Sequence, residues 1–149
     1  MNAGTLCKRD VITTPRTTSI QDAARLMRKH HVGSLIVTEE KSGVTEPVGI
    51  LTDRDIVMEV IAADIDINEV TVDDIMSYAL LKVCEGDSIL ETAQRMRARG
   101  VRRVPVINNN CELVGILALD DILELLSEEL SMLTRLTSRE AEQEKKKRA

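Results

Sequence analysis

Residues 48–56 read Val-Gly-Ile-Leu-Thr-Asp-Arg-Asp-Ile, and residues 114–122 read Val-Gly-Ile-Leu-Ala-Leu-Asp-Asp-Ile. The two stretches share six of nine residues at an offset of 66. Upstream of them, residues 19–38 and 88–107 share seven of twenty residues at an offset of 69. Self-similarity at a fixed spacing indicates a duplicated structural unit. The change of offset places three extra residues in a loop of the first copy, where a surface connection tolerates them.

Each copy predicts the same order of elements, which is helix, strand, strand, helix. Ser19 and Ser88 are predicted helix N-caps, because each is followed three residues later by an acidic residue and by apolar residues at helical spacing. Two short runs rich in β-branched residues follow each helix, separated by a polar loop. The predicted strands span residues 32–38 and 47–51 in the first copy and residues 101–107 and 113–117 in the second.

The predicted fold is an α+β pair of repeats. A short lead-in segment precedes each copy, at residues 10–14 and 80–84, and a further helix begins near residues 53 and 120. At about fifty residues, neither copy alone would bury much apolar surface, so we expect the two sheets to pack together with pseudo-twofold symmetry. The predicted boundaries are repeat 1 at 5–65, repeat 2 at 70–130, and a C-terminal helix extension with a charged tail at 131–149.

The composition argues against several classes of protein. The net charge of −5 disfavours a nucleic-acid-binding body, because affinity for phosphate backbones comes largely from Lys and Arg. Tyr78 is the one aromatic residue in the sequence, so bases have no set of rings on which to stack. No long apolar stretch or leader predicts membrane insertion or export, so we expect a cytoplasmic protein with no membrane partner.

The cysteines and histidines do not form a metal-binding pattern. Cys7, Cys84 and Cys111 lie far apart without CxxC spacing, so we expect free thiols and no metal. His30 and His31 are adjacent at a predicted helix end, where a positive charge is favourable but neighbouring residues do not share a helix face. No defensible nucleophile or Walker-type glycine motif is present, so the sequence predicts no enzymatic activity.

Three segments resemble the pattern of the CBS (cystathionine-beta-synthase) domain family: Asp74 to Met76, Gly100 to Val106, and Gly49 to Asp55. The resemblance covers nearly everything from Thr5 to Glu129. It implies a stand-alone tandem pair, or Bateman module, of the kind found in inosine monophosphate dehydrogenase, chloride channels and the gamma subunit of AMP-activated protein kinase. Such pairs bind adenosine-containing ligands, commonly AMP, ADP, ATP or S-adenosylmethionine, and control an attached or associated protein.

The resemblance implies a ligand motif, Gly-hydrophobic-x-Thr/Ser-x-x-Asp, which the first copy contains as Gly49, Ile50, Thr52 and Asp55. In that reading the glycine admits the ligand close to the backbone, and the Thr52 hydroxyl binds a phosphate at a helix start. Asp55 accepts hydrogen bonds from ribose hydroxyls. Thr52 and Asp55 also fit a capping box that needs no ligand, and both interpretations can hold together.

The family resemblance further implies that Arg102 and Arg103 of the second copy reach across to the phosphates held by the first. Guanidinium groups suit that role, although the two could also be an ordinary solvated pair. The second copy keeps the acid as Asp121 but has Ala118 where the first has a threonine. In the first copy, Gly33 and Ser34 stand at the positions that correspond to the two arginines. We therefore expect a working nucleotide site in the first copy, and a second site that is weak, empty or suited to an uncharged ligand such as adenosine.

A stripe of leucines continues past the end of the second repeat at helical spacing. Such an apolar surplus predicts a protein interface, and we expect a homodimer held largely by the final helices of each copy. The leading hypothesis is a regulatory module that senses an adenosine nucleotide and controls an unknown partner protein. The alternative is an interaction scaffold whose ligand sites are vestigial.

Overall fold

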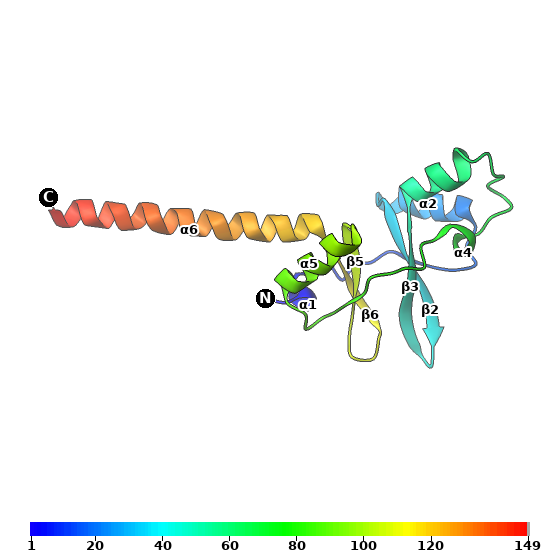
Figure 1. The fold of residues 1–149 in the computed structure, drawn as a ribbon, viewed down its shortest axis with the longest axis horizontal. Coiled ribbons are helices and arrows are strands. Elements are labelled where there is room, and N and C mark those ends of the chain that lie inside the picture. The colour runs from blue at the N-terminus through cyan, green and yellow to red at the C-terminus, as the bar shows by residue number, and fades with distance from the viewer. Residues whose placement is uncertain (149) are drawn as a thin grey trace.

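The computed structural model describes residues 1–148, which form two three-stranded sheets with helices packed against them (Figure 1). The predicted α+β class and the duplication are confirmed. The first half contains α1 (Ala3–Leu6), β1 (Thr13–Pro15), α2 (Ile20–His30), β2 (Ser34–Lys41), β3 (Val44–Thr52), α3 (Asp53–Ile56) and the π-helix η1 (Val57–Ile61). The second half contains α4 (Val72–Ile75), β4 (Val83–Cys84), α5 (Ile89–Arg99), β5 (Arg103–Ile107), β6 (Leu113–Ala118) and α6 (Leu119–Arg148).

The two sheets have the same topology. In the first, β2 lies in the middle, parallel to β1 and antiparallel to β3. In the second, β5 lies in the middle, parallel to β4 and antiparallel to β6. The predicted order of elements is therefore confirmed in both copies.

Side-chain caps set the start of α2 in the first repeat and of α5 in the second. The Ser19 and Ser88 hydroxyls accept hydrogen bonds from the backbone N–H groups of Asp22 and Glu91, both at 3.1 Å. Each helix ends in a left-handed residue, His31 at φ 53° after α2 and a glycine at φ 66° after α5. Both predicted N-caps are confirmed.

The loop predicted in the first copy is a hairpin extension. Strands β2 and β3 continue to Lys41 and from Val44, past the predicted ends, and pair along their whole length. Ser42 and Gly43 form the turn, with φ values of 52° and 78°. A two-residue turn with positive φ at both positions matches strand twist, so the three extra residues lengthen the ladder and do not form an irregular loop.

The segments that begin with α1 and α4 and run to Asp10 and Ala79 are exchanged between the repeats, and we call them the exchanged lead-ins or crossing segments. The strands of the predicted lead-ins at 10–14 and 80–84 stay in their own sheets as β1 and β4. Helix α1 and the residues after it pack on the second sheet, where Lys8 and Ile116 exchange backbone hydrogen bonds of 2.9 and 2.8 Å. Helix α4 and the residues after it pack on the first sheet, where Ser77 and Ile50 exchange bonds of 3.0 and 3.3 Å. Each lead-in thus completes the repeat to which it does not belong in sequence.

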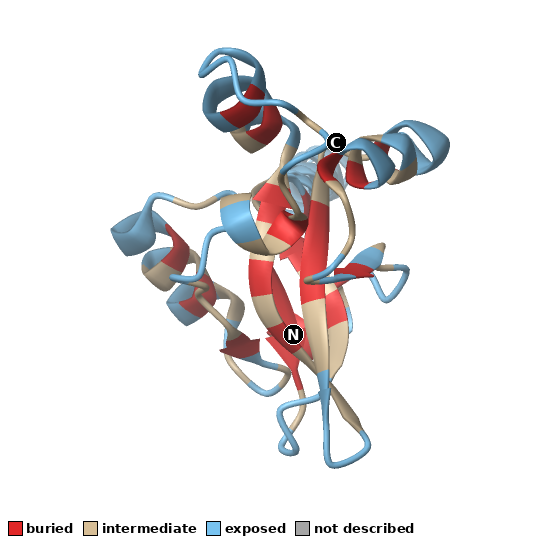
Figure 2. Cartoon of the chain, turned by 90° about the vertical axis from the view of Figure 1, so that its right-hand side faces the viewer, coloured by how far each residue is buried: buried red, intermediate tan, exposed pale blue. Residues whose placement is uncertain are grey.

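Figure 2 shows that buried residues lie on the strands and on parts of the helices. Most of the buried hydrophobic residues form two clusters, one per sheet. The exchange is visible in their membership: Val72 and Met76 of the second lead-in belong to the first cluster, and Ala3 and Cys7 of the first lead-in belong to the second. The sheets meet where β3 contacts β6. The expected pairing of the sheets is present, but the core is split and the exchanged segments join its halves.

Two equivalent glycines make room for the exchange. A Cβ on Gly115 would lie 2.5 Å from Cys7 Sγ and 2.8 Å from the Lys8 carbonyl oxygen. A Cβ on Gly49 would lie 2.7 Å from Met76 Sδ and 3.0 Å from a backbone carbonyl oxygen. Any larger residue at either position would push the crossing segment off its sheet.

We expect Gly115→Ala to destabilise the protein by about 1–3 kcal/mol, the usual cost of overpacking a core. Gly86→Ala is the matched control, because no atom lies within 4 Å of the added Cβ and the φ of Gly86 is not positive. Urea unfolding of both variants measures the difference. Equal stability of the two variants would contradict the proposed need for a glycine under the crossing segment.

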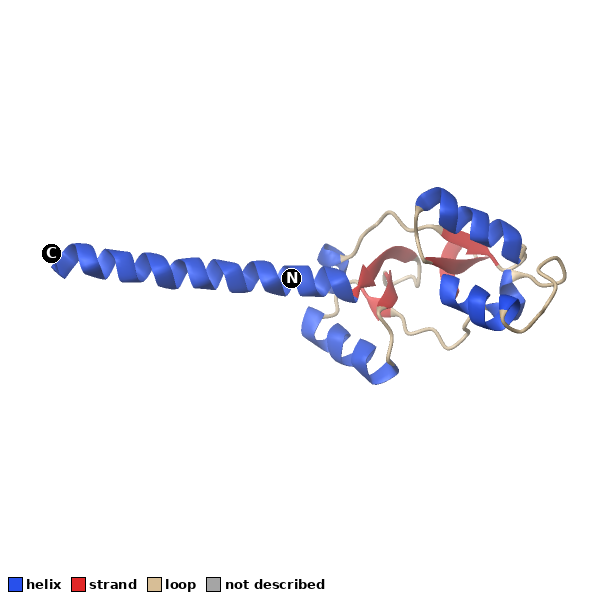
Figure 3. Ribbon diagram, turned by 90° about the horizontal axis from the view of Figure 1, so that it is seen from above, coloured by secondary structure: helices blue, strands red, loops and turns tan. Residues whose placement is uncertain are grey.

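Helix α6 leaves the body of the protein and extends far beyond it (Figures 1 and 3). Its 30 residues correspond to a length of about 45 Å. Only Asp121 and Ile122 near its start are buried, and the helix continues through the charged residues to Arg148. The last residue of the predicted 131–149 extension, Ala149, lies outside the described residues. Across residues 1–148, no helix combines the length and apolar character that a membrane span requires.

Candidate functional site

A cavity of about 500 Å³ lies between the two repeats. We call it the Thr52 cavity. The end of β3 and the start of α3 form one side, and the crossing segment after α4 together with the start of β5 forms the other. Its lining residues are Gly33, Ser34, Ile50, Thr52, Asp53, Arg54, Ser77, Ala79, Leu80, Leu81, Gly100, Val101, Arg102 and Arg103.

The structure brings together four of the predicted site residues in this cavity. Ile50 and Thr52 come from the first repeat, and Arg102 and Arg103 come from the second. Arg54, which the sequence analysis did not single out, adds a third guanidinium group. With Asp53 as the one carboxylate of the lining, the cavity has an excess of positive charge.

Gly49 and Asp55 have roles different from those expected. Neither Gly49 nor Asp55 lines the cavity, and the side chain of Met76 covers Gly49. Asp55 Oδ2 accepts a hydrogen bond from the Thr52 backbone N–H at 2.9 Å, and Thr52 Oγ1 accepts one from the Asp55 N–H at 3.1 Å. The capping-box interpretation is therefore confirmed. Since a hydroxyl has its own hydrogen to donate, Thr52 keeps a donor for a ligand while it accepts this bond.

Arg102 is exposed and only loosely held. Its side chain is 71% exposed, and Nη2 lies 3.6 Å from Oδ1 of Asp120, which is 75% exposed. Ion pairs that are this open to water contribute little to stability. The side chain can therefore leave Asp120 for a ligand phosphate at small cost.

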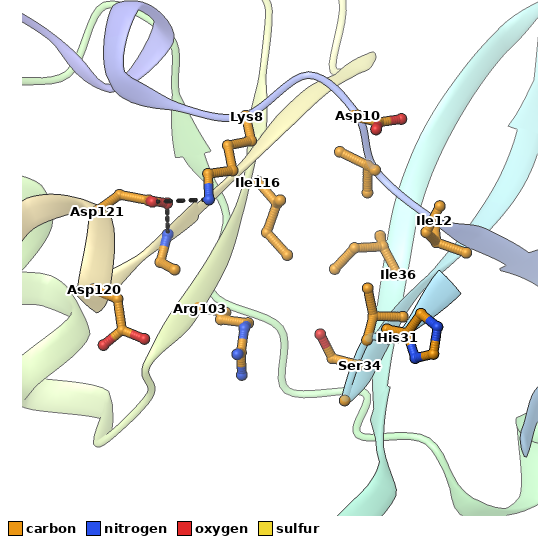
Figure 4. A pocket seen from close by; sticks show the side chains of 14 residues that line it. Lys8, Asp10, Ile12, His31, Ser34, Ile36, Arg103, Ile116, Asp120 and Asp121 are labelled. Carbon is orange, nitrogen blue, oxygen red and sulfur yellow. Dashed lines mark hydrogen bonds and ion pairs between the residues drawn. The ribbon is translucent and has the colours of Figure 1, made fainter. Parts of the chain in front are cut away.

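A second cavity, of about 290 Å³, is the pseudo-twofold counterpart of the first (Figure 4). We call it the Asp121 cavity. Its lining residues are Lys8, Asp10, Val11, Ile12, His31, Val32, Gly33, Ser34, Ile36, Arg103, Ile116, Ala118, Asp120 and Asp121. Where the Thr52 cavity has Thr52 and Arg54, this one has Ala118 and Asp120 at the offset of 66.

The Asp121 side chain is buried, and both of its carboxylate oxygens have partners within the protein. Its Oδ2 accepts a hydrogen bond from the Ala118 backbone N–H at 3.2 Å, as Asp55 does in the other copy. Its Oδ1 lies 3.3 Å from Lys8 Nζ (Figure 4). The acid recurs in both copies because it caps the helix in both. Of the motif positions this site keeps the acid, and Lys8 and Arg103, which the motif comparison did not include, also line it.

Lys8, Asp10 and His31 line this cavity but were not predicted as site residues from the sequence. Lys8 and Asp10 belong to the exchanged lead-in. When each copy is considered by itself, they are assigned to the first sheet, although the lead-in packs on the second. Their signal was available, because the offset of 69 that relates the copies places them on Ser77 and Ala79 of the other cavity wall. His31, expected as a plain helix end, is the left-handed cap that borders the cavity.

Tyr78 anchors the wall of the Thr52 cavity. It lies between Ser77 and Ala79, and its hydroxyl is 2.8 Å from Asp73 Oδ1 and 2.7 Å from the Asp73 carbonyl oxygen. Arg16 binds the same carboxylate at 3.1 Å, and its guanidinium lies 5.8 Å from the centre of the Tyr78 ring. The hydrogen bond from Tyr78, followed by that from Arg16, lowers the pKa of Asp73. The same hydrogen bond to Asp73 raises the pKa of Tyr78.

Tyr78 is the only tyrosine and the sequence has no tryptophan, so ultraviolet absorbance reports its ionisation alone. We expect its titration midpoint to lie above the ordinary pKa of about 10, because ionisation removes the hydrogen bond that the Tyr78 hydroxyl donates to Asp73 and places a phenolate beside that carboxylate. The stabilisation is complete below the ordinary pKa and is lost as pH rises through the raised one. Asp73→Asn should move the midpoint back toward 10. A midpoint that is the same in both proteins would show that the contact is absent in solution.

The chain belongs to the CBS domain family. The family model for the CBS domain matches residues 3–62 and 72–128, so the protein contains a tandem pair. Uncharacterized protein MK0525 of Methanopyrus kandleri is 36% identical over 125 residues, which are 84% of this chain. The match spans 62% of that relative's length.

Solved structures of CBS proteins have the same fold. The CBS domain pair of protein MJ0100, in complex with 5′-methylthioadenosine and S-adenosyl-L-methionine, aligns with a TM-score of 0.74 at 25% identity. That alignment covers 87% of this chain and 98% of the other. Hypoxic Response Protein I with two coordinated zinc ions aligns with a TM-score of 0.72 at 33% identity, over 83% of this chain and 98% of the other. Within residues 1–148 of this chain, no three His, Cys, Asp or Glu side chains cluster in a way that could hold a metal ion.

Proposed function

We propose that this protein is a cytoplasmic regulatory module, without catalytic activity, that binds an adenosine nucleotide such as AMP, ADP or ATP and controls a partner protein. The observation that carries the proposal is the convergence of three arginines and the Thr52 hydroxyl on one cavity between the repeats. The volume of about 500 Å³ lies within the range of small-molecule sites.

The two sides of the Thr52 cavity suit the two ends of a nucleotide. Leu80, Leu81 and Val101 provide an apolar surface for a base, and Arg102 and Arg103 provide guanidinium groups for phosphate. Bidentate contacts of that kind are shorter and stronger than neutral hydrogen bonds. For the ribose we propose Asp55, which lies outside the lining of the cavity, next to Arg54 in the sequence, and whose Oδ1 is not part of the capping box. The adenosine ligands of the MJ0100 pair support this class of ligand.

Replacing both Arg102 and Arg103 with Met should weaken AMP binding far more than adenosine binding. A charge-assisted hydrogen bond contributes about 1.5–3 kcal/mol, so the affinity for AMP should fall at least tenfold. Adenosine has no phosphate, and its affinity should stay within about twofold. Isothermal titration calorimetry measures both ligands, and Arg97→Met, on the exposed side of α5, is the control for lost charge. Equal losses for both ligands would reduce the two arginines to a structural role.

If millimolar AMP, ADP, ATP and S-adenosylmethionine all fail to raise the melting temperature of the wild-type protein, the scaffold with vestigial sites replaces this proposal. A bound ligand at a hundred times its dissociation constant should stabilise the fold by about 2.7 kcal/mol. Such a shift is readily visible in a thermal scan.

We further propose that a second copy of the chain covers the exposed side of α6. Six large apolar residues on this helix are more than half exposed: Leu123, Leu126, Leu130, Met132, Leu133 and Leu136. Val57, Met58 and Ile61 on the corresponding helix of the first repeat are also half exposed or more. A contiguous apolar surface of this kind marks an interface, and twofold pairing of identical chains is the commonest way to bury it.

Combining Leu126→Glu and Leu130→Glu should convert the dimer to a monomer of 16.6 kDa, because four carboxylates would meet in the apolar interface. Light scattering at micromolar concentration gives the mass. Ser131→Glu combined with Ser138→Glu adds the same charge on another side of the helix and should leave the dimer intact. A monomeric wild type, or a dimer that survives the leucine substitutions, would contradict the proposal.

A further inference from the structure

One wall of the Thr52 cavity is a stretch of chain without helix or strand. It comprises residues 78–82, between the backbone bridge at Ser77 and the start of β4 at Val83, and we call it the wall segment. Its residues 79–81 line the cavity and include the two leucines of the apolar surface. The position of the wall segment therefore determines the shape of the cavity.

The second repeat holds the wall segment through two backbone carbonyl groups. Arg99 Nη2 donates a hydrogen bond to the Ala79 carbonyl oxygen at 3.1 Å. Arg95 Nη2 donates one to the Lys82 carbonyl oxygen, also at 3.1 Å. Both arginines lie on α5, so these bonds tie the wall segment to the second repeat.

A series of ion pairs ties the wall segment to the first repeat. Acids and bases alternate along it in the order Asp73, Arg16, Glu39, Lys41, Glu46 and Lys82, and we call these six residues the ion-pair chain. The nitrogen and oxygen atoms of successive partners lie 3.1, 3.5, 3.8, 3.8 and 3.5 Å apart. The two ends of the ion-pair chain belong to the second copy, and its middle belongs to the first.

The hairpin extension of the first copy provides the middle of the ion-pair chain. Glu39 and Glu46 lie directly opposite each other in the ladder between β2 and β3. Like charges at such positions repel each other unless cations lie beside them. Lys41 lies 3.8 Å from both carboxylates, and Arg16 and Lys82 each bind one of them. The acid pair therefore attracts Lys82 of the wall segment to the first repeat.

The other end of the ion-pair chain holds the first residue of the wall segment. The Asp73 carboxylate that binds Arg16 also accepts the hydrogen bond from the Tyr78 hydroxyl, at 2.8 Å. The wall segment is thus held at both ends, by Tyr78 and by Lys82. The Glu46 side chain is 22% exposed and that of Lys82 is 33% exposed, so salt screens this pair less than a fully exposed one.

The second copy does not contain the residues of the ion-pair chain. A backbone contact recurs in both copies: the Asp73 N–H donates to the Arg16 carbonyl oxygen at 3.0 Å. At the offset of 69, the Gly4 N–H donates to the Glu85 carbonyl oxygen at 2.8 Å. Glycine and glutamate cannot form the ion pair that aspartate and arginine form. Since the fold makes the backbone contact without that pair, the ion-pair chain serves the Thr52 cavity and not the fold.

We propose that the ion-pair chain positions the wall segment against the ligand, so that charged residues outside the Thr52 cavity determine its affinity. None of the six residues lines the cavity. The inference rests on the proposed nucleotide site and adds positioning residues to it. Since the wall segment provides the apolar surface for the base, the ion-pair chain affects the binding of uncharged adenosine.

Combining Glu39→Gln with Glu46→Gln removes the centre of the ion-pair chain and keeps the shape of both side chains. It also removes the repulsion within the ladder, so the hairpin should still fold. Adenosine affinity, measured by calorimetry, should fall about three- to tenfold, the combined contribution of two partly exposed ion pairs. Arg25→Met, which breaks the exposed pair with Asp22 on α2, is the control and should bind adenosine like the wild type.

A change of the opposite charge should have the same effect. Lys82→Met should weaken adenosine binding about two- to fivefold, and Lys82→Arg should restore it, because arginine can still bind Glu46. The glutamine variant loses negative charge and Lys82→Met loses positive charge. A loss of affinity in both therefore identifies the pair itself and not the net charge of the protein.

Salt distinguishes positioning from a general loss of stability. Adenosine carries no charge, so salt acts on its affinity through the charges of the protein. Raising potassium chloride from about 0.1 M to about 1 M shortens the Debye length from about 10 to about 3 Å. The adenosine affinity of the wild type should fall toward that of the glutamine variant, whose own affinity should stay within about twofold.

Hydrogen exchange tests the wall segment without a ligand. The Leu80 N–H donates to the Tyr78 carbonyl oxygen at 2.8 Å within the segment. Its exchange should be about threefold faster in the glutamine variant, because the segment opens more often, and unchanged in Arg25→Met. Unchanged Leu80 exchange, or wild-type adenosine affinity in the glutamine variant, would overturn the inference. A wild type that binds neither adenosine nor AMP would contradict the proposed nucleotide site instead, and Leu80 exchange would still decide whether the ion-pair chain holds the wall segment.

Discussion

The exchange of backbone hydrogen bonds between each lead-in segment and the other repeat's outer strand holds this structure together. Lys8 with Ile116, and Ser77 with Ile50, each form one antiparallel bridge with two backbone hydrogen bonds. A single repeat has a three-stranded sheet and too little buried surface to be stable alone. The exchange places each lead-in helix in the other core, so unfolding one repeat exposes apolar residues of both.

The same exchange creates the cavities. In each crossing segment, the residues that follow the backbone bridge form one wall of a cavity. Every cavity is therefore built from both copies, with a strand and helix start from one and a lead-in and strand start from the other. A ligand that fills such a cavity contacts both repeats at once, and its binding energy depends on their relative position.

The sequence predicts what is local and misses what is exchanged. The N-caps and the order of elements follow from capping chemistry and from the repeat, whereas the convergence of Thr52 with Arg102 was implied by the family resemblance. Gly49 was expected to face a ligand. In the structure Met76 of the other copy lies against it, and the residues of one copy alone do not predict that contact. Lys8 was missed for the same reason. The hydrophobic pattern within one copy does not indicate on which sheet its lead-in packs. The same apolar residues of the lead-in are buried on either sheet.

The two copies also separate the needs of the fold from those of the cavities. Residues that the exchange or the helix cap requires are identical in both copies, as in the pairs Gly49 and Gly115, Ile50 and Ile116, and Asp55 and Asp121. Several polar positions that line the cavities differ, as in the pairs Thr52 and Ala118, Arg54 and Asp120, and Ser34 and Arg103. The backbone thus repeats one architecture, while a few exposed side chains decide the charge of each cavity. Because the two cavities share a wall, a single arginine in one copy changes the chemistry of both.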